Sequence, residues 1–188
     1  MCMRLALTAE SRPTPALDVR PAAVEDLETV QSILAEASTW LASRGIAQWP
    51  TGFRKERSRR RIEQGIEQGT VLLAFVQGEP VATITLDGWA DPEFWDASDN
   101  AGYVHRLAVR RSWAGRGIGE ALLDWAGQRV AERGGRWLRL DCMRDNKRLH
   151  AYYRRLGFEH VRDVELGHRI SGSLFQRPAG YRCSSLAR

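Results

Sequence analysis

The positions of the hydrophobic residues predict strands and helices that alternate along the chain. Apolar residues at three- and four-residue steps predict amphipathic helices over residues 23–43, 54–68, 117–135 and 146–155. Short apolar runs predict strands over residues 17–20, 70–77, 81–86, 102–109, 136–142, 159–166 and 171–177. This order predicts an α/β (or α+β) layered fold, a mixed central sheet of about seven strands with helices on both faces.

Glycine residues mark where several of these elements end. Gly134-Gly135 ends the third helix. Gly78-Glu79 predicts a two-residue turn that joins two strands in a hairpin. We therefore expect a flexible leader over residues 1–16, one domain over residues 17–177 and a tail over residues 178–188.

Between the strand that ends at Val109 and the next helix, glycine occupies every second position, at Gly115, Gly117 and Gly119. The first amide N–H groups of a helix have no intrahelical partner and lie at the positive end of its dipole. Glycine also lets a ligand approach the backbone. The stretch therefore predicts an anion site, most simply for phosphate. A Rossmann fingerprint does not fit, because the position of its last glycine is Glu120, and a Walker Gly-Lys-Ser/Thr sequence is absent.

This stretch resembles the pyrophosphate loop of the GNAT family of N-acetyltransferases. The family pattern is Arg or Gln, two residues, Gly, one residue, and Gly or Ala, after a strand that ends in a Leu-x-Val-like sequence. Residues 107–109 (Leu-Ala-Val) match the strand end, and Gly117 and Gly119 match the two small positions. Ala114 stands where the family has Arg or Gln, so a polar side chain that stabilises the loop is missing.

A second motif resembles the same family. Asn146 lies seven residues before Tyr153, which opens a Tyr-x-x-x-Gly-Phe sequence completed by Gly157 and Phe158. The two motifs occur in the family's order, with one helix and one strand between them. The resemblance extends over residues 17–177.

The resemblance implies the GNAT fold, acetyl-CoA as acyl donor, and a primary amine of a small molecule or peptide as acceptor. In that fold, the strands before and after the glycine loop splay apart, and the pantetheine arm enters the V and pairs with the open strand edge. The residues then expected to bind acetyl-CoA are Leu107, Ala108, Val109, Arg111, Gly115, Arg116, Gly117, Ile118, Gly119, Glu120 and Asn146. The competing interpretation is exposed charge for Arg111 and a helix N-cap for Asn146.

Direct attack on the thioester requires a neutral amine, and deprotonating a lysine-like amine at pH 7 costs about 4.6 kcal/mol. Family members often place a Glu on the strand before the loop, but residues 103–106 contain none. His105 is the candidate base, because histidine ordinarily titrates near neutrality. Strand alternation predicts that His105 shares a face with Leu107. A structural histidine is the competing interpretation. Further candidates, without a spacing argument, are Asp141, Asp87 and Glu93.

The CoA thiolate must also leave the reaction. Tyr153 occupies the position of the family's general acid, and its phenol can donate a proton to that sulfur. Tyr152 is then expected to pack in the core. The reaction needs no acyl-enzyme, so we interpret Cys142 as a packed thiol rather than a nucleophile.

The acceptor site is less well defined by the sequence. In this fold, the loop over residues 43–53 usually forms its wall, and Trp49 is the candidate substrate-binding residue. With Trp89 and Trp95 of the acidic segment 87–99, Trp49 could form an apolar pocket with a carboxylate rim for a cationic amine. Core and lid packing of these tryptophans is the alternative. Polyamines, aminoglycosides, amino acids and protein N-termini all remain candidate acceptors.

Composition narrows the functional classes. The net charge is +5, from 28 Lys plus Arg against 23 Asp plus Glu. The basic run over residues 54–61 contains no interleaved aromatics, so we interpret it as a solvated helix face rather than a nucleic-acid site. The three cysteines and four histidines lack metal-ligand spacing, and sparse cysteines suggest a reducing cytoplasm. No run approaches the roughly 18 apolar residues of a membrane span.

Two questions stay open at the sequence level. Because the glutamate is missing and Ala114 departs from the pattern, a non-catalytic acyl-CoA-binding or regulatory module of the same fold is the alternative function. Dimers are frequent in the family, so the resemblance also admits a homodimer, although no stretch marks an interface.

Overall fold

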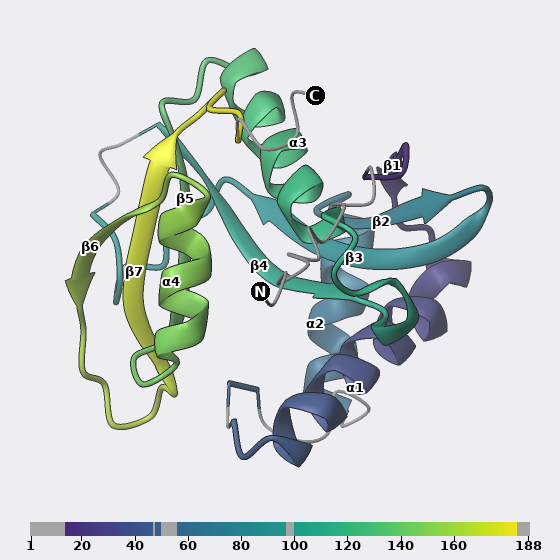
Figure 1. Cartoon of the computed structure of the whole chain (residues 1–188), viewed down its shortest axis with the longest axis horizontal. Helices are drawn as coiled ribbons and strands as arrows, with labels where there is room; N and C mark the ends of the chain where they lie inside the picture. The colour runs from purple at the N-terminus through teal and green to yellow at the C-terminus, as the bar shows by residue number, and fades with distance from the viewer. Residues whose placement is uncertain (1–13, 47, 50–55, 97–99, 184–188) are drawn as a thin grey trace, which may run out of the picture.

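The computed structural model describes residues 14–46, 48–49, 56–96 and 100–183. Its strands form a seven-stranded sheet with the order β1-β2-β3-β4-β5-β7-β6 (Figure 1). Neighbouring strands pair antiparallel, except β4 and β5, which pair parallel, so the sheet is mixed as predicted. The strands are β1 (Asp18–Pro21), β2 (Val71–Val76), β3 (Glu79–Asp87), β4 (Ala101–Val109), β5 (Trp137–Met143), β6 (Glu159–Asp163) and β7 (Ser171–Pro178).

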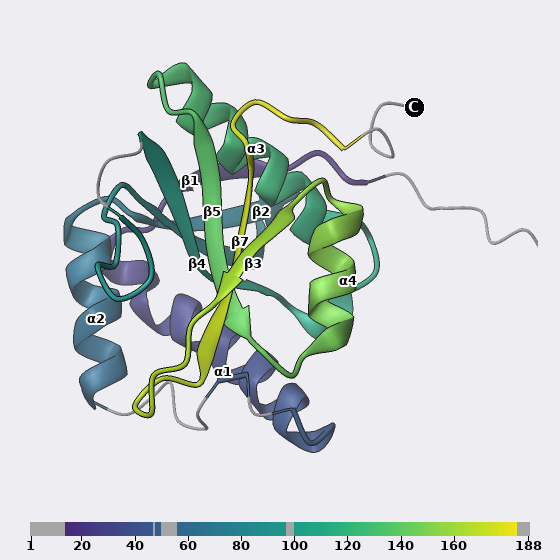
Figure 2. The ribbon, with the colours of Figure 1, turned by 90° about the vertical axis from the view of Figure 1, so that its left-hand side faces the viewer.

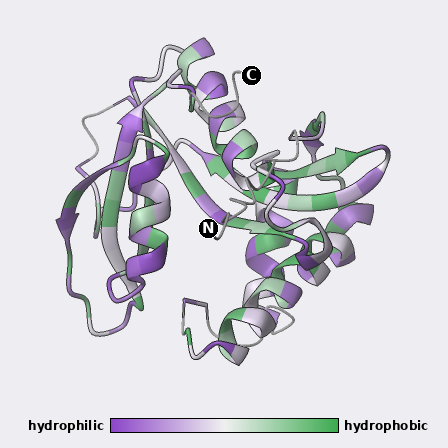
Figure 3. Cartoon of the chain, in the orientation of Figure 1, coloured by the Kyte–Doolittle hydropathy of each residue, from purple (hydrophilic) through white to green (hydrophobic). Residues whose placement is uncertain are grey.

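Helices cover both faces of the sheet (Figures 1 and 2). On one face, α1 (Leu27–Ser43) and α2 (Glu56–Glu67) enclose a core with side chains of β2. On the other face, α3 (Ile118–Glu132) and α4 (Lys147–Arg155) enclose a second core with side chains of β3, β4 and β5. In Figure 3, β2 and β3 are mainly hydrophobic, whereas α4 carries broad hydrophilic bands on its outer side. The predicted layered fold is confirmed.

Several predicted boundaries change by a few residues. The turn between β2 and β3 lies at Gln77-Gly78, not at the predicted Gly78-Glu79. Both turn residues have positive φ (51° and 81°), as a two-residue hairpin turn requires, and Glu79 already pairs with Val76. The first helix begins with a 3-10 turn over Val24–Asp26. The predicted start of the second helix, residues 54–55, lies outside the described residues.

The sheet opens between β4 and β5. The two strands pair only from Ala101 opposite Trp137 to Val104 opposite Leu140, and then diverge (Figure 1). Beyond that point, the edge of β4 that faces β5 has no strand partner in the described part of the chain. The chain therefore forms the V that the family resemblance implies.

Both ends of the described chain contact this framework. Residues 179–183, in the region expected to be a tail, pack against α3, where the Gly180 amide donates to the Gly127 carbonyl and the buried Cys183 donates its amide to Asp124. The side chain of Thr14, in the region expected to be a leader, lies beside Gly117. Among the described helices, none has the length and apolar character needed to cross a membrane.

Candidate active site

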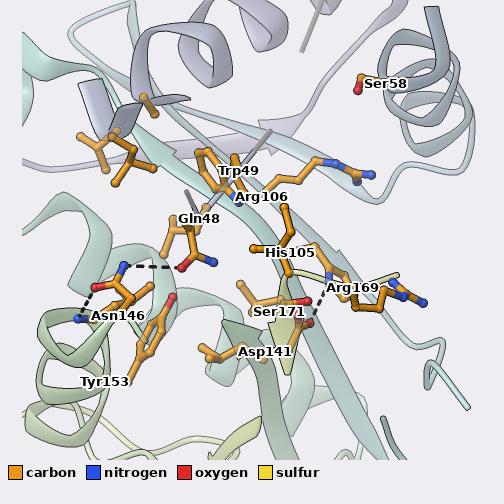
Figure 4. A pocket seen from close by; sticks show the side chains of 18 of the residues that line it. Gln48, Trp49, Ser58, His105, Arg106, Asp141, Asn146, Tyr153, Arg169 and Ser171 are labelled. Atoms are coloured by element: carbon orange, nitrogen blue, oxygen red, sulfur yellow. Dashed lines mark hydrogen bonds and ion pairs between the residues drawn. The ribbon is translucent and has the colours of Figure 1, made fainter. Parts of the chain in front are cut away.

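A cavity of about 560 Å³ occupies the opening between β4 and β5 (Figure 4). Its walls come from α1 and the loop after it, α2, β4, β5, α4 and the segment before β7. Seven of the predicted site residues line this cavity: Trp49, His105, Leu107, Val109, Arg111, Asn146 and Tyr153. The fold thus brings the strand end, the second motif and the candidate acceptor wall to one place.

The glycine loop presents a run of free backbone donors. The amide N–H groups of residues 115–120 donate no hydrogen bond to any described residue, and the first helical bond of α3 is from the Ala121 amide to the Gly117 carbonyl. Gly115 and Gly117 have φ values of +77° and +73°, a conformation that side chains rarely adopt. The loop can therefore surround an anion with N–H groups at the positive end of α3. Ile118 and Ala108 are buried, so only their backbone groups are available to a ligand.

The charged residues near the loop have different partners. Arg116 lies 4.5 Å from the Trp113 ring centroid and donates to the Ser112 carbonyl. Arg111 stacks 3.9 Å from the Trp40 ring centroid at the cavity wall. Glu120, in the first turn of α3, pairs with Arg155 of α4 at 2.8 Å. These contacts leave Arg116 and Arg111 at the surface near the loop, and Glu120 tied to the neighbouring helix.

Two adjacent tyrosines of α4 have separate environments. Tyr153 is 9% exposed and packs against Phe158 and Phe175, and its hydroxyl points into the cavity (Figure 4). Burial raises the pKa of Tyr153 well above its usual value, so the phenol keeps its proton. Tyr152 packs at the edge of the same core, with its hydroxyl beside Gly119.

The start of α4 is held by Asn146 and by a residue from the first half of the chain. The Asn146 side-chain oxygen accepts from the Leu149 amide at 3.1 Å, which is an N-cap bond. Its Nδ2 donates to Gln48 at 3.5 Å, and the Met143 amide at the end of β5 donates to the same Gln48 oxygen at 3.2 Å (Figure 4). The structural interpretation of Asn146 therefore holds, and Gln48 connects the loop after α1 to the end of β5 and the start of α4.

His105 lies between two carboxylates in the cavity. One ring nitrogen is 3.8 Å from Asp141 of β5 (Figure 4), the other is 3.8 Å from Asp87 of β3, and the side chain is 31% exposed. Strand alternation predicted that His105 and Leu107 share a face of the sheet, and this prediction is wrong. A bulge places two β4 residues, Arg106 and Leu107, opposite one residue of β3, and Arg106 has a φ of +48°. Leu107 consequently packs toward α3, while His105 faces the acceptor side.

Of the two interpretations of the tryptophans, the three-tryptophan pocket is wrong. Trp49 lines the cavity, but Trp89 is 63% exposed and Trp95 is buried against Tyr103. The acidic segment is neutralised in part, because Arg169 lies 2.6 Å from both Asp91 and Glu93. Glu93 is thus a salt-bridge residue.

The cavity also contains residues that the sequence did not reveal. Arg106 of β4, Arg61 of α2 and Gln48 all line it. Arg61 stood within a run interpreted as solvated, and Gln48 carries no motif. Arg106 is placed by the bulge, for which the sequence has no glycine signal. Cys142 is buried below the cavity, and burial raises its pKa to about 12, as a packed thiol requires.

Comparisons with known proteins agree with this geometry. The model of the acetyltransferase (GNAT) family matches residues 34–158. YesJ of Bacillus subtilis (strain 168), described as an uncharacterized N-acetyltransferase, is 36% identical over 148 residues, which cover 75% of this chain and 81% of that protein. A GNAT-family acetyltransferase from Listeria monocytogenes superposes with a TM-score of 0.72 at 25% identity, over 86% of this chain and 94% of that one. The PaiA N-acetyltransferase of Thermoplasma acidophilum, solved with coenzyme A, gives 0.68 at 22% identity, over 87% and 99%.

Proposed function

This chain belongs to the GNAT family of N-acetyltransferases, and on that premise we propose that it transfers the acetyl group of acetyl-CoA to a primary amine. The amine attacks the thioester directly in a ternary complex. The observation that carries the proposal is that one opening of the sheet holds a free β4 edge and the Tyr153 hydroxyl, while the loop that follows β4 has unpaired N–H groups at residues 115–120.

Acetyl-CoA would bind along this line. The backbone of Leu107 and Val109 offers a strand edge to the pantetheine arm, as an added strand would use it. The N–H groups of residues 115–120 would hold the pyrophosphate, and Arg116 can add a charged contact. Holding the thioester beside the amine makes the reaction effectively intramolecular.

The acceptor amine must lose a proton before it attacks. His105 faces the acceptor side of the cavity, and Asp87 and Asp141 flank its ring. The two carboxylates can attract the protonated amine toward the ring. His105 is therefore the proposed base, acting directly or through one water molecule.

The proton balance closes at Tyr153. After the attack, the nitrogen loses its second proton to water, and His105 returns the first proton to solvent. As the tetrahedral intermediate collapses, the C–S bond breaks and the thiolate takes a proton from the phenol. Because burial raises its pKa, Tyr153 is fully protonated before each turnover. The phenolate is then reprotonated from solvent as CoA leaves.

The test is Tyr153→Phe, with Tyr152→Phe as the matched control on the same helix. We expect Tyr153→Phe to lower kcat by about 100-fold or more, the ordinary contribution of a general acid. Calorimetric binding of CoA should change little, because the ring and its packing remain. Tyr152→Phe should retain turnover, since its hydroxyl lies beside Gly119 rather than in the cavity.

Two other results would change the assignment. Equal turnover by Tyr153→Phe and the wild type would remove the general-acid role. Tight CoA binding by the wild type, with no thiol release on any class of amine, would favour the non-catalytic acyl-CoA module.

A further inference from the structure

We infer that the acceptor is an amino acid, whose carboxylate binds Arg106 and Arg61 while its amine lies beside His105. This inference rests on the proposed acetyl transfer and goes beyond it by naming the acceptor class. It replaces the expectation of a carboxylate-rimmed pocket for a purely cationic amine.

The inference depends mainly on the lack of a partner for the Arg106 side chain among the described residues. It lines the cavity from the bulge of β4, yet it makes no hydrogen bond or ion pair with any described residue. Neighbouring arginines differ in this respect: Arg110 is bound by Glu36, Ser32 and the Pro80 carbonyl, and Arg169 by two carboxylates. A partly buried guanidinium with five unused donors suits a planar carboxylate that can accept two of them.

A second cation faces the same space. Arg61 of α2 lines the cavity and, like Arg106, has no ion pair within the described ranges. Burial and the charge of Arg61 lower the pKa of Arg106 from its ordinary value, and the charge of Asp87 offsets only part of this effect. The two guanidinium groups therefore repel each other in a partly desolvated place, and a bound anion would relieve that repulsion.

The position of this pair separates it from the proposed acetyl-CoA path. In Figure 4, Arg106 and Ser58 of α2 lie at the opposite end of the cavity from Tyr153 and Asn146. α2 covers the face of the sheet opposite α3, whose first turn carries the glycine loop. The cation pair is therefore placed to bind the acceptor.

The residue next to Arg106 indicates where the amine of the acceptor binds. His105 precedes Arg106 on β4, and two carboxylates flank it, so a positive site and a negative site lie side by side. An amino acid carries its ammonium and carboxylate a few bonds apart, which matches this alternation of charge. A simple amine would leave the two guanidinium groups without an ion-pair partner among the described residues.

The experiment compares acceptors that differ only in the carboxylate. Leucine is paired with isoamylamine, phenylalanine with phenethylamine, and lysine with cadaverine, each with acetyl-CoA and thiol release as readout. We expect kcat/KM for the best amino acid to exceed that of its amine partner at least about 100-fold, because unpaired buried donors reject an analogue that lacks their partner.

Variants test which arginine causes the preference for the amino acid over its amine partner. Arg106→Gln should reduce it toward 1, mainly by raising KM for the amino acid, and Arg106→Lys should restore part of it. Arg61→Gln should reduce it less, because Arg61 is exposed. Arg60→Gln is the matched control on α2, since Arg60 points to Glu56 on the outer surface and should keep the preference unchanged.

Calorimetry separates this inference from the proposed reaction. Leucine and isoamylamine are titrated into CoA-saturated wild type and Arg106→Gln. Carboxylate-dependent binding that Arg106→Gln removes would support the inference even if no acceptor were acetylated, an outcome that would count against the reaction alone. Acetylation of amines and amino acids with equal kcat/KM would overturn the inference and leave the reaction in place. Equal binding of the two ligands, with or without turnover, would also overturn it.

Discussion

At the scale of single residues, burial keeps two groups at the cavity side of the core protonated. Tyr153 and Cys142 lie in the same core, and desolvation is the largest cause of the raised pKa of each. The consequence differs by role, because a protonated phenol is the useful form of a general acid, whereas a protonated thiol is a poor nucleophile. The two groups therefore fit an acetyl transfer that needs no acyl-enzyme.

Cys142 provides a direct test of this distinction. With a pKa of about 12, its thiolate fraction at pH 8 is about 1 in 10,000, so iodoacetamide should leave it unmodified in the native protein for hours. In guanidinium chloride, the same cysteine should react within minutes, because its pKa returns to about 8.5. Peptide mass spectrometry separates Cys142 from Cys183, which is also buried. Rapid native labelling of Cys142 would contradict the packed-thiol interpretation.

Sequence motifs located the residues whose role depends on spacing, but not those placed by the bulge. Tyr153 and the glycines stand at fixed offsets in the two motifs; Tyr153 lines the cavity, and the glycines lie in the loop that follows β4. The face of His105 was predicted wrongly, because Arg106 interrupts strand alternation with a positive φ. A non-glycine residue in that conformation leaves no signal in a single sequence.

At the scale of elements, the contact between α3 and α4 depends on a missing side chain. A Cβ added to Gly119 in the first turn of α3 would lie 2.9 Å from the Tyr152 hydroxyl of α4. Glu120 and Arg155 join the same two helices by an ion pair. Gly119 therefore serves the packing of the helices as well as the approach of a ligand, a role that the motif alone did not indicate.

A double-mutant cycle tests that contact. Gly119→Ala should be neutral or destabilising in the wild type, because the clash opposes the roughly 1 kcal/mol helix preference of alanine over glycine. In a Tyr152→Phe background, the clash is absent and the same change should stabilise the protein. The expected coupling is about 0.5–3 kcal/mol, measured by urea unfolding. Strict additivity would show that the hydroxyl does not limit the residue at position 119.

Hydrophobic periodicity predicted the elements well, because the four helices and the central strands bury side chains in the core clusters. The turn predicted from Gly78-Glu79 was misplaced by one residue, because Glu79 pairs with Val76 and the turn lies at Gln77-Gly78. The periodicity also did not indicate that residues 179–183 pack on α3, since a short segment held by backbone bonds has no periodic pattern.

At the scale of the whole molecule, the sheet consists of two parts that meet along a short parallel pairing. β1 to β4 form one part, and β5, β7 and β6 the other, with β4 and β5 paired only over residues 101–104 and 137–140. Beyond the pairing, the Gln48 side chain connects the loop after α1 to the second part by accepting from the Met143 amide and from Asn146. A single sequence gives the order of the strands along the chain but not the residue at which two strands stop pairing. The prediction of the V therefore came from the family resemblance alone.

CoA bound in the V should therefore stabilise the folded protein through contacts with the glycine loop. Two glycines allow a matched test of this contact. Gly115 in the loop and Gly134 after the far end of α3 have φ values of +77° and +76°, and a Cβ at either would meet no heavy atom within 4 Å. Replacing either with alanine should cost about 1–2 kcal/mol from left-handed backbone strain. CoA at 100 times its Kd should stabilise the wild type and Gly134→Ala by about 2.7 kcal/mol. Gly115→Ala should show a smaller gain at the same CoA concentration, because its added methyl group lies where the pyrophosphate is proposed to bind. Equal CoA-induced shifts in Tm for the two variants would place the pyrophosphate away from the glycine loop.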